Sequence, residues 1–410
     1  MSKAATVGES AGRRSGPALV ALAGCLFAFL TAELLPIASL RQLAAGLHTT
    51  PGAAGLLLSG YAVVAGVLSV PSVALTARLS RRTLVVAALG LLALGQTLLA
   101  IAPSLQLAML GRAVAAASHS VAWAVVPVLA VQLAGPGRAG RATAVTMVGA
   151  SAAMIVGTPA SGWLSAQIGW RATALATAGL ALGMAAALRV LLPGATTATS
   201  APVSGAADGR ARRGRWPVVV VCAVTALVVT GHYVSYGYFE LLAAGSGITG
   251  AGYPLLLAGF GVAGLAALPL VGRTLDRRPG VLAAALPGAL LLAFGTIAVA
   301  VSTHRAPAAV AGALVWGAAI GGLPVWLQGT VIRLAGAGAE RWSAWYVTAF
   351  QVGIAGGAAL GGFLLGDPRD PRPVLLPSVS AAVAAATLLV TAATYRRVFA
   401  VTAGPGPARR

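Results

Sequence analysis

Long apolar segments recur along the whole chain and alternate with short polar ones. A helix needs about 20 apolar residues to cross about 30 Å of hydrocarbon. Proline and glycine inside such a segment do not exclude it, because membrane helices tolerate both. The pattern predicts twelve transmembrane helices, at residues 17–40, 53–77, 83–102, 105–132, 142–166, 170–193, 216–243, 251–274, 280–301, 306–332, 343–366 and 373–395.

The composition agrees with a chain surrounded by lipid. Of the 410 residues, 58% are hydrophobic and only 9% are charged, whereas soluble domains carry about 25% charged residues. The net charge of +20 is typical of nucleic-acid partners, but the arginines lie in short clusters between apolar segments and no nucleic-acid motif accompanies them. We therefore predict an all-α polytopic membrane protein with lipid, and no nucleic acid, as its partner.

The positive charges predict the orientation. If both termini are cytoplasmic, 22 of the 28 Lys and Arg residues fall in cytoplasmic segments and five in external ones. Cytoplasmic loops of membrane proteins carry this excess of positive charge. The distribution predicts cytoplasmic termini and an even number of spans.

The longest hydrophilic segment divides the predicted helices into two sets of six. It covers residues 194–215, is rich in Ala, Thr, Ser, Gly and Arg, and is typical of a flexible linker. Internal duplication of this kind occurs in many secondary transporters, whose substrate site lies between the repeats. The predicted organisation is a tail at 1–16, a six-helix bundle at 17–193, the linker at 194–215, a pseudo-symmetric six-helix bundle at 216–396, and a tail at 397–410.

Four local motifs accompany this pattern. Two are basic loops, after the second and the eighth predicted helix, and two lie within the fourth and fifth helices. The loop residues are Arg78, Arg81 and Arg82, then Gly272, Asp276 and Arg277; the helix residues are Arg112, then Gly157, Pro159 and Gly162.

Together these motifs resemble the major facilitator superfamily, and within it the twelve-span drug:proton antiporters, including bacterial sugar and chloramphenicol efflux pumps. The resemblance covers about residues 17–396. It implies gating roles for the basic loops, a proton-coupling role for Arg112, and an exporter-type element at Gly157, Pro159 and Gly162. The first loop departs from the family pattern, because Ala77 stands where the family has an Asp that latches the two halves.

Ionisable residues inside the membrane are functional candidates, because each costs about 2.5–3.5 kcal/mol at a helix centre. Glu33 lies about 24 Å from the cytoplasmic end of the first helix, and Arg112 about 10 Å from the outer end of the fourth. Both fall in the outer half, so we predict that they meet and carry proton coupling. The alternative is a static ion pair that fixes two helices.

Two helical faces predict a substrate cavity. The first face carries Arg112, His119 and Trp123, which are spaced i, i+7, i+11. The second face follows i, i+4, i+8 and carries His232, Tyr236 and Glu240. The alternatives are that the histidines are core residues bonded to nearby carbonyls, that the aromatic residues only pack, and that the Glu240 carboxyl lies at the membrane interface.

Small-residue patterns predict close helix packing. Gly259–Gly264 fits G-x-G-x-x-G, but it lies in an apolar helix without the strand that a dinucleotide site requires. The stripes at Gly149, Ala153, Gly157 and at Gly353, Gly357, Gly361 have the spacing of membrane helix contacts. No P-loop, metal cluster or cofactor motif is present, and Cys25 and Cys222 are interpreted as inert core residues.

The sequence therefore predicts a secondary active transporter in a bacterial plasma membrane. Its proposed activity is proton-coupled efflux of a small organic compound such as a drug or sugar, by a monomer. Three alternatives remain: an uncoupled facilitator or importer of the same fold, a transport-dead receptor, and a membrane-bound enzyme. The enzyme is disfavoured because only eight acidic residues occur and no nucleophile–base pair is evident.

Overall fold

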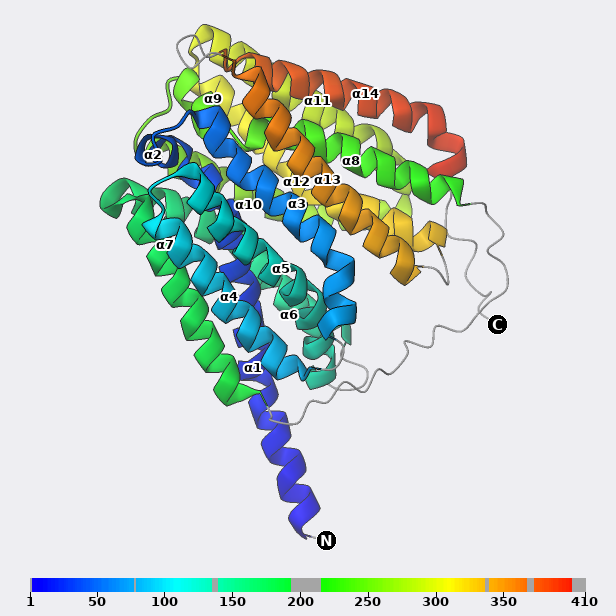
Figure 1. Ribbon diagram of the computed structural model, residues 1–410. Helices are drawn as coiled ribbons and strands as arrows, with labels where there is room; N and C mark the ends of the chain where they lie inside the picture. The colour runs from blue at the N-terminus through cyan, green and yellow to red at the C-terminus, as the bar shows by residue number, and fades with distance from the viewer. Residues whose placement is uncertain are drawn as a thin grey trace, which may run out of the picture. The chain divides into compact units, whose positions relative to one another are not determined.

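The computed structural model describes residues 2–76, 79–134, 139–192, 215–335, 339–366 and 372–399. Within these ranges the regular structure is helical and contains no strand, which confirms the all-α prediction (Figure 1). The first set of helices is α1 Ser2–Ala38, α2 Leu40–Gly46, α3 Pro51–Thr76, α4 Arg81–Ile101, α5 Leu105–Ala134, α6 Ala139–Ala152, the π-helical turn η1 Ala153–Gly157 and α7 Thr158–Leu191. The second set is α8 Trp216–Tyr236, α9 Phe239–Gly245, α10 Gly252–Arg277, α11 Pro279–Thr303, α12 Ala306–Ala335, α13 Ala339–Leu364 and α14 Leu375–Val398.

Ten segments of the described chain are long and apolar enough to cross a membrane. One of them, Val148–Leu191, has 44 residues and is interrupted at Gly169, whose φ of 84° and ψ of 154° are non-helical. Only glycine adopts such a conformation readily, so this segment makes two spans. With the 30-residue helix α5, the segments account for the twelve predicted spans.

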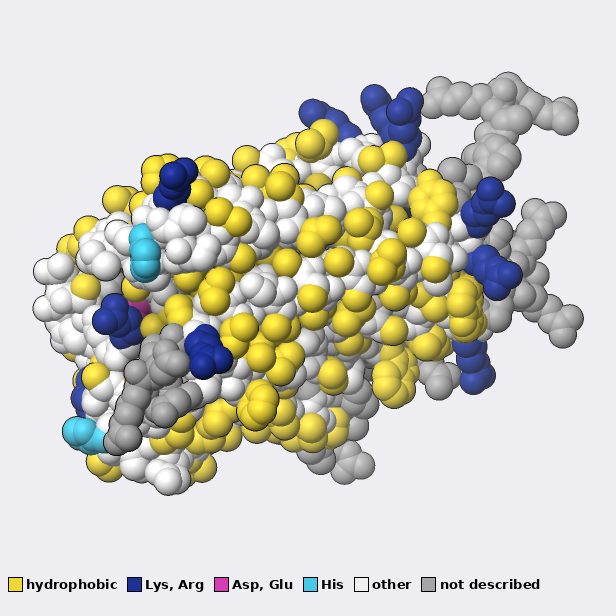
Figure 2. Space-filling model, turned by 90° about the horizontal axis from the view of Figure 1, so that it is seen from above, with side chains coloured by type: hydrophobic (Ala, Val, Ile, Leu, Met, Phe, Trp, Pro, Cys, Tyr) yellow, Lys and Arg dark blue, Asp and Glu magenta, His cyan; other side chains and the backbone are white. Residues whose placement is uncertain are grey.

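Hydrophobic side chains also cover the outside of the molecule. Phe363, Val190 and Leu255 are 82%, 78% and 71% exposed. Figure 2 shows hydrophobic side chains along the middle of the visible face and Lys and Arg near its two ends. Burial in lipid removes this apolar surface from water. The chain is a multi-pass membrane protein.

The chain forms two compact units. Unit 1 comprises Met1–Thr49 and Gly60–Ala201, and unit 2 comprises Thr50–Ser59 and Pro202–Arg410. The first residues of α3 therefore group with unit 2. The predicted linker, 194–215, lies outside the described residues except for Arg215.

Corresponding helices pack in the same way inside each unit (Figure 1). In unit 1, α1 packs against α6 and α7, and α4 packs against α5 and α7. In unit 2, α8 packs against α13 and α14, and α11 packs against α12 and α14. The short helices α2 and α9 each have seven residues and follow α1 and α8 after a break. This repetition is what an internal duplication produces.

Local chemistry sets several helix boundaries. Ser80 caps α4 by accepting a hydrogen bond from the Thr83 amide at 3.2 Å. Thr50 does the same for Ala53 at 3.1 Å, just before Pro51 at the start of α3. Pro159 has no amide hydrogen and its ring crowds the carbonyl four residues before it. The π-helical turn η1 ends two residues before this proline, and Thr158 Oγ1 donates to the Ala153 carbonyl at 3.1 Å.

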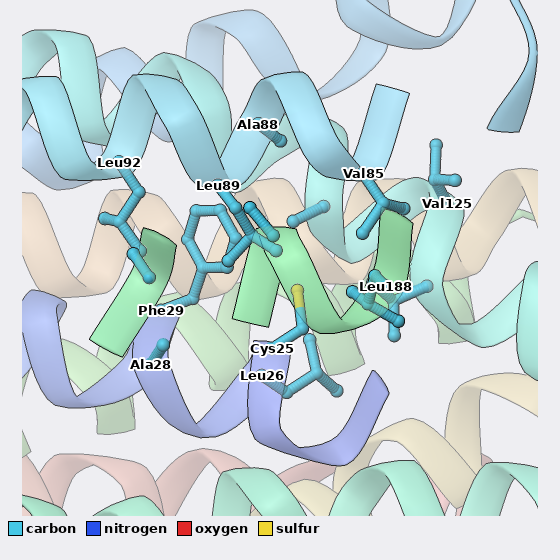
Figure 3. Close-up of a cluster of buried hydrophobic side chains, with 14 of the residues drawn as sticks. Cys25, Leu26, Ala28, Phe29, Val85, Ala88, Leu89, Leu92, Val125 and Leu188 are labelled. Atoms are coloured by element: carbon cyan, nitrogen blue, oxygen red, sulfur yellow. The ribbon is translucent and has the colours of Figure 1, made fainter. Parts of the chain in front are cut away.

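The core of unit 1 is made where α1, α4, α5 and α7 meet. Figure 3 shows the side chains of α1 facing those of α4, with Val125 of α5 and Leu188 of α7 beside them. Cys25 is a fully buried member of this cluster, and both cysteines are free thiols. The labelled residues are Cys25, Leu26, Ala28, Phe29, Val85, Ala88, Leu89, Leu92, Val125 and Leu188.

The small-residue stripes lie at close helix contacts, which confirms their predicted role. In unit 1, a Cβ atom on Gly149 would collide with the Ala23 carbonyl of α1, and one on Gly157 would collide with Thr31 Oγ1. In unit 2, a Cβ atom on Gly264 would lie 3.0 Å from the Gly317 carbonyl oxygen of α12. The G-x-G-x-x-G segment is therefore a helix-packing surface.

The contact of α13 with α8 gives a stability prediction. Gly357 is buried, and a Cβ atom there would collide with the Thr230 carbonyl oxygen, whereas the neighbouring Gly356 is exposed and its Cβ would lie 3.8 Å from Thr230 Oγ1. We expect Gly357→Ala to destabilise the protein by about 1–3 kcal/mol through overpacking. The matched control Gly356→Ala should be neutral or slightly stabilising, because alanine is the better helix former. Thermal unfolding of the two purified variants compares them, and equal midpoints would contradict the packing role.

Candidate functional site

The predicted coupling residues lie together inside unit 1. Glu33 comes from α1, Tyr61 from α3, and Arg112 and His119 from α5. Arg112 and Tyr61 are fully buried, and Glu33 and His119 are 4% and 8% exposed. We call these four residues the polar cluster.

Arg112 is held by the main chain of α1. Its guanidinium donates to the carbonyl oxygens of Ala32 and Glu33, each at 2.7 Å. The Ala32 carbonyl lacks its helical donor because residue 36 is a proline, which has no amide hydrogen. The Arg112 side chain supplies the missing donor, and its guanidinium carbon also lies 4.3 Å from the centre of the Tyr61 ring. The buried guanidinium and the buried carbonyl thus satisfy each other's need for a hydrogen-bond partner.

The Glu33 carboxyl lies beside His119. Glu33 Oε2 is 3.5 Å from His119 Nδ1, and the Tyr61 hydroxyl is 2.9 Å from the same nitrogen. When Nδ1 carries a proton it can donate to either oxygen, and when it is bare it accepts from Tyr61. The predicted proximity of Glu33 and Arg112 is present, and it brings His119 and Tyr61 into the same group.

Trp123 extends the face of α5, as its spacing predicted. Its ring packs on His119 with centroids 5.6 Å apart. The indole Nε1–H is buried and has no hydrogen-bond partner within the described chain. An unpaired buried donor is costly in a folded protein, so this group is a candidate for contact with a bound molecule.

A second group of predicted residues lies inside unit 2. His232 and Tyr236 of α8 are stacked, with ring centroids 4.7 Å apart and an interplanar angle of 23°. Trp316 of α12 donates from Nε1 to His232 Nδ1 at 2.9 Å. Phe260 of α10 also stacks on Tyr236, with ring centroids 5.3 Å apart. These residues are nearly fully buried.

Glu240 does not continue the face of α8. Helix α8 ends at Tyr236, and Tyr238 has φ −125° and ψ 25° before α9 begins at Phe239. The predicted i, i+4, i+8 spacing therefore fails at its third member, because the helix is broken before Glu240. Glu240 is half-buried in the first turn of α9, where an acidic side chain interacts favourably with the positive end of the helix dipole.

The motif residues lie at helix ends. Arg82, in the first turn of α4, donates to the main-chain carbonyl of Arg189 near the end of α7, where a positive charge is favourable. Gly272 and Arg277 lie towards the end of α10, and Arg277 is exposed. Arg78 and the side chain of Asp276 lie outside the described residues. Gly157 and Pro159 flank the junction of η1 and α7, and Gly162 is buried one turn later.

Tyr61 and Trp316 were not predicted from the sequence. Each is an uncharged aromatic residue in an apolar helix, where aromatic side chains most often only pack.

Among the described residues, no group of three or more His, Cys, Asp or Glu side chains could hold a metal ion.

Comparison with known proteins assigns the family. The profile of the Major Facilitator Superfamily matches residues 20–358. The chain belongs to the Major Facilitator Superfamily. Among its relatives, a chloramphenicol efflux pump of Mycobacterium tuberculosis is 39% identical over 84% of this chain and 85% of its own. A probable sugar efflux transporter of Mannheimia succiniciproducens is 27% identical over 84% of this chain and 85% of its own.

Solved structures agree with this superfamily fold. A nucleoside transporter has a TM-score of 0.74 at 11% identity, covering 92% of this chain and 98% of its own. A peptide transporter in complex with alafosfalin has a TM-score of 0.75 at 12% identity, covering 95% and 96%. At these identities the likeness describes the fold. As a Major Facilitator Superfamily member, the protein is a secondary transporter of small molecules in a lipid membrane.

Proposed function

We propose that this transporter exports a small organic compound, such as a drug or a sugar, in exchange for protons. It acts as a monomer in a bacterial plasma membrane, with both termini in the cytoplasm. Residues 17–193 and 216–396 form the two moving halves, joined by the linker at 194–215. Transport follows from alternating access to the two sides of the membrane, as in other secondary transporters.

The polar cluster is the observation that carries the proton-coupling proposal. A carboxyl, an imidazole, a phenol and a guanidinium lie within contact distance in the apolar interior of unit 1. Such groups are costly at membrane depth and mark proton relays in pumps and transporters. Glu33 is the proton carrier in this proposal. The positive charge of Arg112 stabilises the ionised form of the Glu33 carboxyl. His119 and Tyr61 offer alternative partners for the carboxyl as its protonation changes.

Direction and substrate class rest on the relatives. The relatives named above are called efflux proteins, for chloramphenicol in one case and sugar in the other. We assign Trp123, His232 and Tyr236 to the substrate route with His119. Arg78, Arg81, Arg82, Gly272, Asp276 and Arg277 are assigned to gating, and Gly157, Pro159 and Gly162 to the antiporter element.

Purified protein in liposomes tests this proposal. A pH gradient is imposed, internal pH is followed with a trapped dye, and chloramphenicol, glucose and a set of nucleosides are added in turn. We expect at least one compound to release protons along the gradient while it accumulates against its own. Protein-free liposomes and a protonophore are the controls. A substrate flux that is unchanged by the protonophore would indicate an uncoupled facilitator. Binding without flux would indicate a receptor.

A further inference from the structure

His232 lies in a buried aromatic group that sequence reasoning identified only in part. Trp316 of α12 is fully buried at the centre of this group. Its ring centroid lies 5.0–5.8 Å from those of five neighbouring rings. These belong to His232, Tyr236, Phe239, Phe260 and Phe294.

The hydrogen bond from Trp316 determines where His232 carries its proton. An indole N–H can only donate, and it lies 2.9 Å from His232 Nδ1. Nδ1 must therefore be the acceptor, and the proton of the neutral imidazole is on Nε2. A second proton on Nδ1 would place two donors face to face at that distance. The bond thus fixes both the tautomer and the orientation of the ring.

His119 in unit 1 has the opposite kind of partner. Its Nδ1 faces the Tyr61 hydroxyl and the Glu33 carboxyl. When this nitrogen carries a proton, the oxygen of either group can accept a hydrogen bond from it. His119 can therefore change the position of its proton, whereas His232 cannot do so without losing Trp316. The two buried histidines are suited to different tasks.

The Nε2–H of His232 is the remaining polar group of the ring. Within the described chain no residue accepts a hydrogen bond from it, although His232 is only 3% exposed. A ring N–H that donates to no described residue is suited to an acceptor that the protein itself does not provide. His232, Tyr236 and Phe260 form a near-parallel stack, with interplanar angles of 23° and 22°.

We propose that Trp316 is a positioning residue that holds His232 as an Nε2–H donor for an acceptor oxygen of the transported compound. The aromatic stack favours a compound with a flat or ring-shaped body, and the fixed donor favours a nitro, carbonyl or hydroxyl oxygen at its edge. Trp316 acts through His232 and makes no substrate contact of its own. This inference rests on the proposed transport function. It specifies which substrate chemistry the residues of unit 2 would recognise.

Nitrogen NMR of protein labelled at histidine tests the tautomer directly. We expect His232 in the wild type to show a protonated Nε2 and a bare Nδ1. In Trp316→Phe, which keeps the ring but removes the donor, the two tautomers should mix. Adding chloramphenicol or glucose, as probes with acceptor oxygens, should shift the Nε2 signal of the wild type. A proton on Nδ1 in the wild type would overturn the positioning role, and an Nε2 signal unmoved by both probes would overturn the donor role.

Substrate exchange at equal pH on both sides then separates positioning from packing. The probe that shifts Nε2 is used, and KM and maximal rate are measured. Trp316→Phe should raise KM about three- to tenfold with little change in maximal rate, as expected for one lost neutral hydrogen bond. His232→Gln keeps an amide N–H near the Nε2 position but removes the imidazole from the stack, so its KM should rise, though less than that of His232→Asn. His232→Asn places its amide near Nδ1 and should raise KM at least as much as Trp316→Phe.

A double variant completes the test. If Trp316 acts only through His232, adding Trp316→Phe to His232→Gln should change KM little further. Fully additive losses, or equal behaviour of the Gln and Asn variants, would overturn the proposal. This exchange assay needs no proton gradient, so failure of proton coupling is recognised separately by the internal-pH signal.

Discussion

Replacing Glu33 with Gln is expected to abolish uphill export while leaving exchange of substrate at equal concentrations. The glutamine keeps the size and hydrogen-bonding capacity of the buried side chain but cannot take up or release a proton. Glu33 Oε2 lies 3.5 Å from His119 Nδ1, and an amide can occupy the same space. The substrate should therefore still bind and cross, but the proton gradient can no longer drive it. Export and exchange are measured on the same proteoliposomes.

Two comparisons make this result specific. Glu33→Asp retains an ionisable group on a shorter side chain and should keep partial uphill export. Protein yield and a symmetric size-exclusion profile verify that each variant is folded. Undiminished uphill export by Glu33→Gln would assign coupling to another group. Loss of exchange together with export would instead indicate the static role, in which Glu33 fixes neighbouring helices.

Much of the fold follows from the sequence because its signals are local and strong. Apolar length alone predicted the spans, since each helix must satisfy its own backbone in lipid. The small-residue stripes predicted which faces approach closely, and Gly149 and Gly357 lie at such contacts. Helix breaks were harder to predict. The interruption at Tyr238, which separates Glu240 from α8, has no proline beside it.

The candidate site was predictable where an ionisable side chain or helical spacing marks it. Glu33 and Arg112 are conspicuous in apolar helices, and their depths predicted that they would meet. The sequence does not reveal that Arg112 binds the main chain, because the open carbonyl depends on Pro36 in a different helix. Tyr61 and Trp316 carry no charge and are found only when the helices are assembled. Side chains far apart in sequence thus define the chemistry of both groups.

The link between Arg112 and Pro36 gives a second large expected effect. Arg112→Met keeps much of the side-chain volume but removes two hydrogen bonds from a charged donor, each worth about 1.5–3 kcal/mol. It also leaves the Ala32 carbonyl without a donor. We expect the free energy of unfolding to fall by about 3 kcal/mol and uphill export to be lost. SDS titration of the purified protein measures the first effect, and the proteoliposome assay measures the second.

Restoring the missing amide should recover part of that stability. Pro36→Ala supplies an N–H four residues after Ala32, so the helix can satisfy the carbonyl itself. In the Arg112→Met background this change should stabilise the protein by about 1 kcal/mol more than it does in the wild type. Transport should not return, because the guanidinium is still absent. A coupling energy near zero in this double-mutant cycle would mean that Arg112 is held by its other contacts, such as the Tyr61 ring 4.3 Å from its guanidinium carbon, rather than by the carbonyl that Pro36 leaves open.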